Sequence, residues 1–166
     1  MSSAGTSGGL GPGPGEGEAL RFNGALGVLR ATADQTEGRY TVMELLASKG
    51  FGSPLHIHRN EDEFFVVLSG EVRVQHGEDV VEAVAGSVVY GPRDVAHEFH
   101  VDSAEARLLL LFGPAGVEGF FREGGKPARS LGLPPPDEQF PDRQALMEVA
   151  GRYHQEFVGP PLPPRG

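Results

Sequence analysis

The feature that most restricts the fold is a series of short strand-like runs, closely spaced through the middle of the chain. Each run is rich in β-branched, aromatic or aliphatic residues, and Gly, Pro, Asn and Asp stand between neighbouring runs. Many short strands at such spacing are typical of antiparallel sandwiches and barrels. We therefore predict an all-β fold. The runs are residues 39–47, 63–70, 71–75, 80–84, 87–91, 96–101 and 106–112, with a hairpin turn at 76–79.

The sequence changes character at both ends. Residues 1–17 are rich in glycine and poor in apolar groups, which predicts a flexible tail. Strand-like patterning then extends over residues 18–112 and predicts one barrel domain. Residues 113–166 are predicted to form a helical and extended segment that packs on the barrel.

Two helices are expected in this C-terminal segment, at 115–123 and 142–157. Their apolar residues recur at helical spacing. We expect these stripes to pack on the outside of the β core rather than to contact a bound cofactor. The stripes consist of Val117, Phe120 and Phe121 in the first helix and of Leu146, Val149, Ala150 and Tyr153 in the second.

Charge and composition exclude several classes of function. The net charge is −9, and the arginines form no basic run, so a nucleic-acid partner is not expected. There is no cysteine, hence no disulfide and no thiolate ligand. No apolar run approaches the roughly 18 residues that span a bilayer, and no secretory signal is visible. These absences predict a cytoplasmic protein that does not enter a membrane.

Metal-ligand residue types gather around one short stretch. His56 and His58 are two positions apart, so on a strand they point to the same face, about 6.8 Å apart. Residues 59–62 form a polar turn, after which the chain is expected to return alongside as a hairpin that Glu63 opens. His97 begins a later strand and is the candidate fourth ligand.

The spacing of these residues resembles the two sequence motifs of the cupin superfamily. The likeness to the first motif rests on Gly50, His56, His58, Glu63 and Gly70, and the likeness to the second on Gly86, Pro92 and His97. Asp94 stands where the pattern usually has glycine, and Val101 where it often has asparagine. Neither is a ligand position, and Asp tolerates a left-handed turn. Gly70 and Gly86 are expected at turns that need a positive φ.

The resemblance implies a double-stranded β-helix, or jelly roll, with short C-terminal helices. It also implies that His56, His58, Glu63 and His97 hold one divalent transition metal ion. Nitrogen and oxygen ligands without a thiolate suit Fe, Mn, Ni, Co or Zn alike. Strand alternation places three apolar side chains inside the barrel with the metal, namely Phe65, Val67 and Phe99. The remaining histidines, His76, His100 and His154, are expected on the surface or in loops.

Residues 113–128 and 131–136 look similar to the segment that follows the barrel in bacterial single-domain cupins of the quercetin-dioxygenase-like branch. This likeness favours a metal-dependent dioxygenase that acts on a flavonol or another enolisable aromatic molecule. Metal coordination would lower the pKa of a substrate hydroxyl. Glu63 would accept the proton as the catalytic residue, and dioxygen would then attack the enolate and open the ring.

Two other functions remain open from the sequence. The first is a metal enzyme without redox chemistry, such as an isomerase, cyclase or lyase, in which the ion stabilises an enolate. The second is a binding protein in which the metal helps to hold a small molecule. Family members commonly pair through sheet edges, so the resemblance also implies a homodimer.

Overall fold

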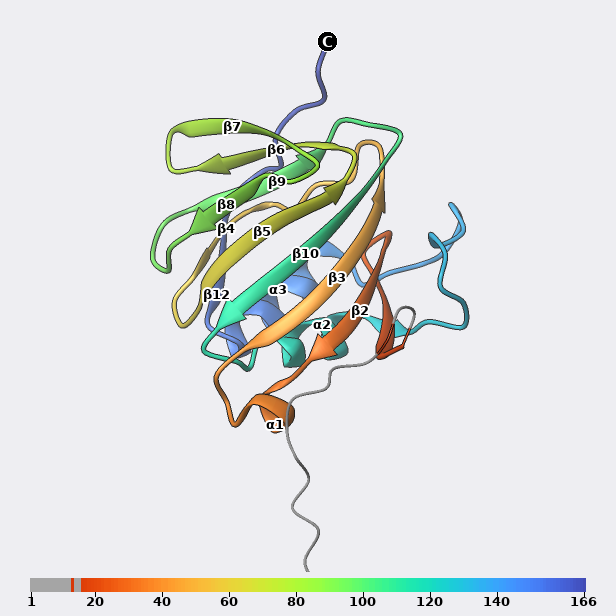
Figure 1. Cartoon of the computed structure of the whole chain (residues 1–166), viewed down its shortest axis with the longest axis vertical. Helices are drawn as coiled ribbons and strands as arrows, with labels where there is room; N and C mark the ends of the chain where they lie inside the picture. Colours follow the sequence, from red (N-terminus) through yellow and green to blue (C-terminus); the bar gives the residue numbers. More distant parts are fainter. Residues whose placement is uncertain (1–12, 14–15) are drawn as a thin grey trace, which may run out of the picture.

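The chain folds into two antiparallel β-sheets that face each other, as Figure 1 shows for a computed structural model that describes residue 13 and residues 16–166. The larger sheet has the strand order β11-β1-β2-β3-β10-β5-β8, and the smaller sheet has the order β12-β4-β9-β6-β7. The predicted all-β, double-stranded β-helix is thus confirmed. Of the predicted tail, residues 1–12 and 14–15 lie outside the described residues.

The strands and helices have the following bounds. The larger sheet contains β1 (Glu18–Phe22), β2 (Ala25–Ala31), β3 (Thr41–Ser48), β5 (Asp62–Ser69), β8 (Val88–Gly91), β10 (Glu105–Gly113) and β11 (Lys126–Pro127). The smaller sheet contains β4 (Leu55–His58), β6 (Glu71–His76), β7 (Asp79–Val84), β9 (His97–Val101) and β12 (Gln155–Gly159). The helices are α1 (Ala33–Thr36), α2 (Glu118–Gly124) and α3 (Arg143–Arg152). Among the described residues, no helix combines the length and the apolar character that crossing a membrane requires.

Strand alternation builds the core between the two sheets. In β3, β5 and β10 every second side chain is buried, because successive residues of a strand point to opposite faces. Phe65 and Val67 are each 1% exposed and Phe99 is 5% exposed, which confirms their predicted inward direction. The candidate ligands on these strands are therefore surrounded by buried apolar side chains.

The expected hairpin around residues 59–62 is wrong. β4 belongs to the smaller sheet and β5 to the larger one, so the chain turns a corner between the sheets and the two strands do not pair. Sequence alternation shows which face of a strand is polar, but not which neighbour the strand will choose. As a result, Glu63 reaches the two histidines of β4 from the opposite wall of the barrel.

The second C-terminal helix is shorter than predicted. It ends at Arg152, and after a turn the chain forms β12, which pairs with β4. His154 has a φ of 58°, a left-handed conformation that cannot continue a helix. The following residues, from Gln155 on, pair with the edge of β4 instead. The first helix likewise begins at Glu118 rather than at residue 115.

His100 is not a surface histidine, contrary to prediction. It is 4% exposed, and its Nδ1 atom lies 3.0 Å from Oδ1 of Asp102. Arg73 on the neighbouring strand donates two hydrogen bonds to the same carboxylate, at 2.7 and 2.8 Å. His154 is exposed as expected, and His76 is half-buried. The predicted pairing of two copies through sheet edges stays a prediction.

Gly70 supports the turn between β5 and β6 and yields a stability prediction. Its φ is 86°, and a Cβ atom there would lie 2.4 Å from the carbonyl oxygen of Glu105. We expect Gly70→Ala to lower the free energy of unfolding by roughly 2 kcal/mol, because the left-handed strain and the clash add together. Urea unfolding measures this loss.

Gly86→Ala is the matched control for Gly70→Ala. Gly86 has a φ of 91°, but a Cβ atom there meets nothing within 4 Å. The control should cost only the strain of the left-handed backbone, about 1 kcal/mol. Equal losses in the two variants would contradict the clash with Glu105.

Candidate metal centre

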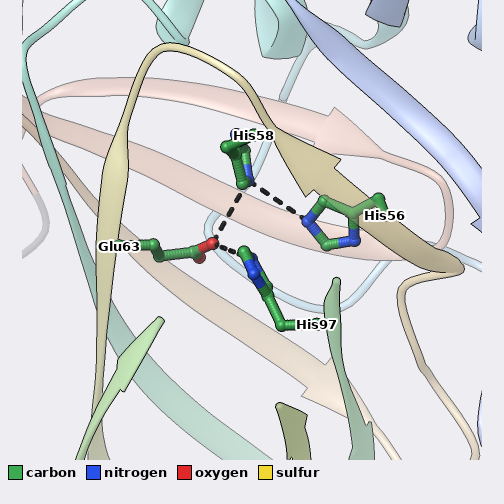
Figure 2. A group of neighbouring side chains, drawn as sticks. All are labelled: His56, His58, Glu63 and His97. Atoms are coloured by element: carbon green, nitrogen blue, oxygen red, sulfur yellow. Dashed lines mark hydrogen bonds and ion pairs between the residues drawn. The ribbon is translucent and has the colours of Figure 1, made fainter. Parts of the chain in front are cut away.

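Three strands bring the four predicted ligand residues to one point inside the barrel (Figure 2). His56 and His58 lie on β4, and His97 lies directly opposite His56 on the neighbouring strand β9. Glu63 comes from β5 in the facing sheet. In Figure 2 the three imidazoles and the carboxylate all point toward a common centre.

The ligand atoms are close together and buried. Nε2 of His56 lies 3.2 Å from Nε2 of His58, which lies 3.2 Å from Oε2 of Glu63. Nε2 of His97 lies 2.9 Å from the same carboxylate oxygen. One ligand atom from each of the four residues falls within 4.8 Å of all the others, and each residue is at most 8% exposed. This cluster could hold a metal ion.

The outer nitrogen of each imidazole faces an acceptor. Nδ1 of His56 lies 2.8 Å from the carbonyl oxygen of Pro54, and Nδ1 of His97 lies 3.1 Å from that of Val95. Nδ1 of His58 lies 3.3 Å from Oε2 of the buried Glu61, without the alignment of a hydrogen bond. A ligand histidine is commonly oriented in this way, since the proton on Nδ1 leaves Nε2 free to coordinate.

This arrangement fits a cation. With the protons on Nδ1, the Nε2 lone pairs of the three histidines point at one another and at the Glu63 carboxylate. Lone pairs that face each other at these distances repel unless a positive charge lies between them. Three neutral imidazoles and one carboxylate meet that need with a divalent transition metal, whose preferred ligands they are.

Burial and neighbouring charges shift the pKa values of the cluster residues in different directions. Burial, together with the neighbouring His58 and His97, lowers the pKa of His56 to about 3. Burial also acts to lower the pKa of His58, but Glu61 and Glu63 outweigh it and raise that pKa to about 9. Burial would raise the pKa of Glu63, yet His58 and His97 hold it at about 2. The two carboxylates thus favour a positive charge at His58, and a metal ion held by the cluster would supply such a charge.

His56, His58 and Glu63 lie in the wall of a cavity whose empty space is about 620 Å³, open solvent at its mouth included. Its lining is almost entirely apolar, and eight of the ten phenylalanines of the chain take part in it. These are Phe22, Phe51, Phe65, Phe99, Phe112, Phe120, Phe121 and Phe157. Beyond the candidate ligands, the polar side chains of the lining are those of Asn23, Ser53 and Gln155, and no lysine or arginine of the described residues takes part.

The C-terminal segment contributes to this cavity, which corrects the expectation that its apolar stripes only cover the outside of the barrel. Phe120 and Phe121 of α2, Leu146 of α3 and Phe157 of β12 all line the cavity. The stripes were identified correctly as buried faces, but periodicity does not show what a buried face encloses. Here the C-terminal segment forms part of the cavity wall, together with strands of the barrel.

Glu61 is a residue of the site that the sequence did not single out. It stood in a polar turn that looked solvent-exposed, yet it is 2% exposed and faces His58. We expect Glu61→Gln to weaken metal affinity by roughly 10- to 100-fold, because it removes the charge that orients and polarises His58. Competition with a chelator of known affinity measures the change.

Asp62→Asn is the control for Glu61→Gln. Asp62 is the adjacent acidic residue, but it pairs with Arg93 rather than with the cluster. Its loss should leave metal affinity unchanged within twofold. If both variants weakened metal binding equally, the effect would be one of overall charge and not of contact with His58.

Comparison with known proteins places these residues in context. Residues 42–112 match the family model described as "Cupin domain". The chain is 41% identical over 54 residues to an uncharacterized protein of Streptomyces coelicolor, a match that covers 32% of this chain and 51% of that protein. It is 26% identical over 113 residues to quercetin 2,3-dioxygenase of Bacillus subtilis, which covers 68% of this chain and 34% of the relative. The matches thus span about half and about a third of these relatives.

A solved structure of similar fold is that of a predicted oxalate decarboxylase from Thermotoga maritima. The two chains superpose with a TM-score of 0.58 at 14% sequence identity, and the match covers 63% of this chain and 98% of the other. At this identity the likeness concerns the fold alone. It agrees with the two facing sheets described above.

Proposed function

We propose, from the match of residues 42–112 to the family model described as "Cupin domain" and from the cavity, that the protein is a metal-dependent enzyme. In this proposal it acts on a neutral, flat, enolisable aromatic molecule, as a dioxygenase of flavonol-like compounds. The observation that carries the proposal is the cavity lining, in which eight phenylalanines surround the candidate metal ligands. The similarity to a quercetin 2,3-dioxygenase supports the same substrate class.

The character of the cavity favours an uncharged substrate. As far as the structure describes the chain, the cavity wall offers no lysine or arginine to a carboxylate or phosphate. A small dicarboxylate held by one end would leave its other end against phenylalanine rings, which costs several kcal/mol of lost hydration. A planar aromatic molecule instead gains from burial and from contact with the rings.

His56, His58, His97 and Glu63 would hold the metal ion. When bound, the ion would supply Lewis-acid activation of a substrate hydroxyl and lower its pKa. Glu63 is the proton acceptor in this proposal, because it supplies the carboxylate of the ligand cluster. The phenylalanine side chains exclude water from the substrate. One dioxygen is consumed for each substrate molecule, and both its atoms enter the products.

Oxygen consumption tests this proposal. Purified protein loaded in turn with Fe(II), Mn(II), Ni(II), Co(II) and Zn(II) is mixed with a flavonol panel, and oxygen uptake and flavonol absorbance are followed together. The expected result is equimolar loss of flavonol and oxygen with at least one metal. Glu63→Gln should slow this reaction while much of the flavonol binding remains, since it removes the proton acceptor.

Other outcomes point to the alternatives. Conversion of enolisable substrates without oxygen uptake would replace the dioxygenase with an isomerase, cyclase or lyase. Tight retention of the flavonol without any turnover would leave a metal-assisted binding protein. An unchanged rate in Glu63→Gln would make Glu63 a ligand without a role in proton transfer.

A further inference from the structure

Gln155 has a buried side-chain amide beside the candidate metal ligands, and neither sequence motif includes this residue. It is the first residue of β12 and lies opposite His58 on β4. Residues paired in this way on an antiparallel sheet have Cα atoms about 5 Å apart and side chains on the same face. Gln155 therefore lies in the cavity wall next to the ligand cluster, where it is 4% exposed.

The Nε2 atom of this amide has no hydrogen-bond partner among the described residues. Such a donor is unusual, because buried polar groups are nearly always paired. Gln155 faces a cavity lined by phenylalanine rings, which offer it no oxygen acceptor. Methionine or leucine would fill the same space without burying a polar group.

The other two neutral polar side chains of the cavity differ from Gln155. Asn23 is exposed, in the turn between β1 and β2. Oγ of Ser53 accepts a hydrogen bond from the backbone of Phe99 and so has a structural partner. Nδ1 of His58 also lacks a hydrogen bond, but it faces Glu61. Among the described residues that line the cavity, Gln155 is thus the one outside the ligand cluster with an unpartnered buried donor.

We propose that Nε2 of Gln155 donates a hydrogen bond to an oxygen atom of the substrate while a second oxygen of the same molecule lies at the metal ligands. This inference rests on the proposed function and narrows its substrate class. The substrate is an aromatic molecule with two oxygens on one edge, such as a hydroxyl beside a carbonyl. If a substrate analogue lacks this oxygen, the Gln155 donor stays unpaired, and the site therefore discriminates strongly against such analogues.

Gln155→Met tests the proposal, because methionine has a similar length and no N–H donor. The probe is 3-hydroxyflavone, titrated into the metal-loaded protein and followed by its absorbance. We expect the variant to raise the Kd about tenfold, the effect of one lost hydrogen bond, with metal content unchanged. The thermal midpoint of the ligand-free variant should be equal to or above that of the wild type, since an unpaired buried donor has been removed.

Glu156→Gln is the matched control, since Glu156 is exposed and pairs with Arg59 away from the cavity. It should leave the Kd of 3-hydroxyflavone unchanged. An unchanged Kd in Gln155→Met would overturn the proposal and leave the proposed function intact. A lower thermal midpoint in Gln155→Met would also overturn it, because the amide would then be a structural group.

Failure of the proposed function can be told apart from failure of this inference. If wild-type protein does not bind 3-hydroxyflavone, the flavonol-like substrate class is wrong. The thermal midpoint of Gln155→Met then decides the role of the amide. A midpoint at or above that of the wild type supports a ligand-binding donor, and a lower midpoint contradicts it.

Discussion

Replacing His97 by alanine should empty the metal site. His97 is fully buried, and its Nε2 atom lies 2.9 Å from the Glu63 carboxylate. Because the site is buried, a side chain from the protein surface cannot replace the lost imidazole as a ligand. Loss of a direct ligand should exceed the 10- to 100-fold loss of affinity that is typical for outer partners. We expect metal content to fall from about one ion per chain to a background level after dialysis, while the far-ultraviolet circular dichroism of the barrel remains.

Thermal unfolding gives a second readout of the same change. A metal present at 100 times its Kd stabilises a protein by about 2.7 kcal/mol, which for a chain of this size raises the midpoint by roughly 5–10 °C. This rise should occur in the wild type and vanish in His97→Ala. His154→Ala is the control, since the His154 side chain is exposed and is not one of the four cluster residues. Wild-type metal content in His97→Ala would show that His97 is not a ligand.

Replacing Glu118 by alanine should cause the largest loss of stability among the changes considered. Its buried carboxylate accepts hydrogen bonds from the backbone of Ala33 at 2.7 Å, the hydroxyl of Thr41 at 2.5 Å and the backbone of Gly116 at 2.9 Å. It thereby ties the start of α1, β3 and the turn before α2 together. Alanine leaves the Ala33 amide and the Thr41 hydroxyl without this acceptor, while Gly116 keeps only a longer bond to Thr41 at 3.3 Å. This loss should cost about 3 kcal/mol, or roughly 10 °C in midpoint.

Urea unfolding at pH 7 measures this loss, with Glu148→Ala as the control. Glu148 is an exposed residue of α3, and its replacement should change the free energy of unfolding by less than about 0.5 kcal/mol. A loss of similar size in both variants would mean that Glu118 does not connect these elements.

The effect of Glu118 should depend on pH. Burial would raise the pKa of Glu118, but the hydrogen bonds from Thr41 and from the backbone outweigh it and lower that pKa. A carboxyl group with a lowered pKa stabilises the fold fully above its ordinary value, and this stability is lost as the pH falls through the lowered pKa. The difference between wild type and Glu118→Ala should therefore narrow below about pH 4.5. A difference that grows on acidification would contradict the assignment.

Much of the candidate site follows from local sequence. His56 and His58 share a strand face because side chains alternate, and this is independent of the neighbouring strands. Gly70 and Gly86 have positive φ values as expected, and Asp94 has a φ of 66° in the left-handed region. These properties depend on a few consecutive residues, and that is why one sequence was enough to predict them.

The missed features all depend on contacts between distant segments. Glu61 looked like an exposed turn residue, because the sequence around it does not show that its carboxylate will face the His58 imidazole. Gln155 fell within a periodic run that fits a helix, and only the free edge of β4 makes it a strand residue. His100 is buried because Arg73 and Asp102 surround it, and Arg73 reaches it from another strand.

The sequence by itself determined the all-β class, the inward faces of the strands and the residue types offered to a metal, since each of these is set by alternation and turn chemistry over a few residues. Only the tertiary structure decided that β4 and β5 lie in opposite sheets, that eight phenylalanines enclose one cavity, and that β12 places an unpaired amide beside His58. Strand pairing and cavity shape depend on which distant surfaces bury each other best, and that free energy belongs to the whole packed chain rather than to any stretch of it.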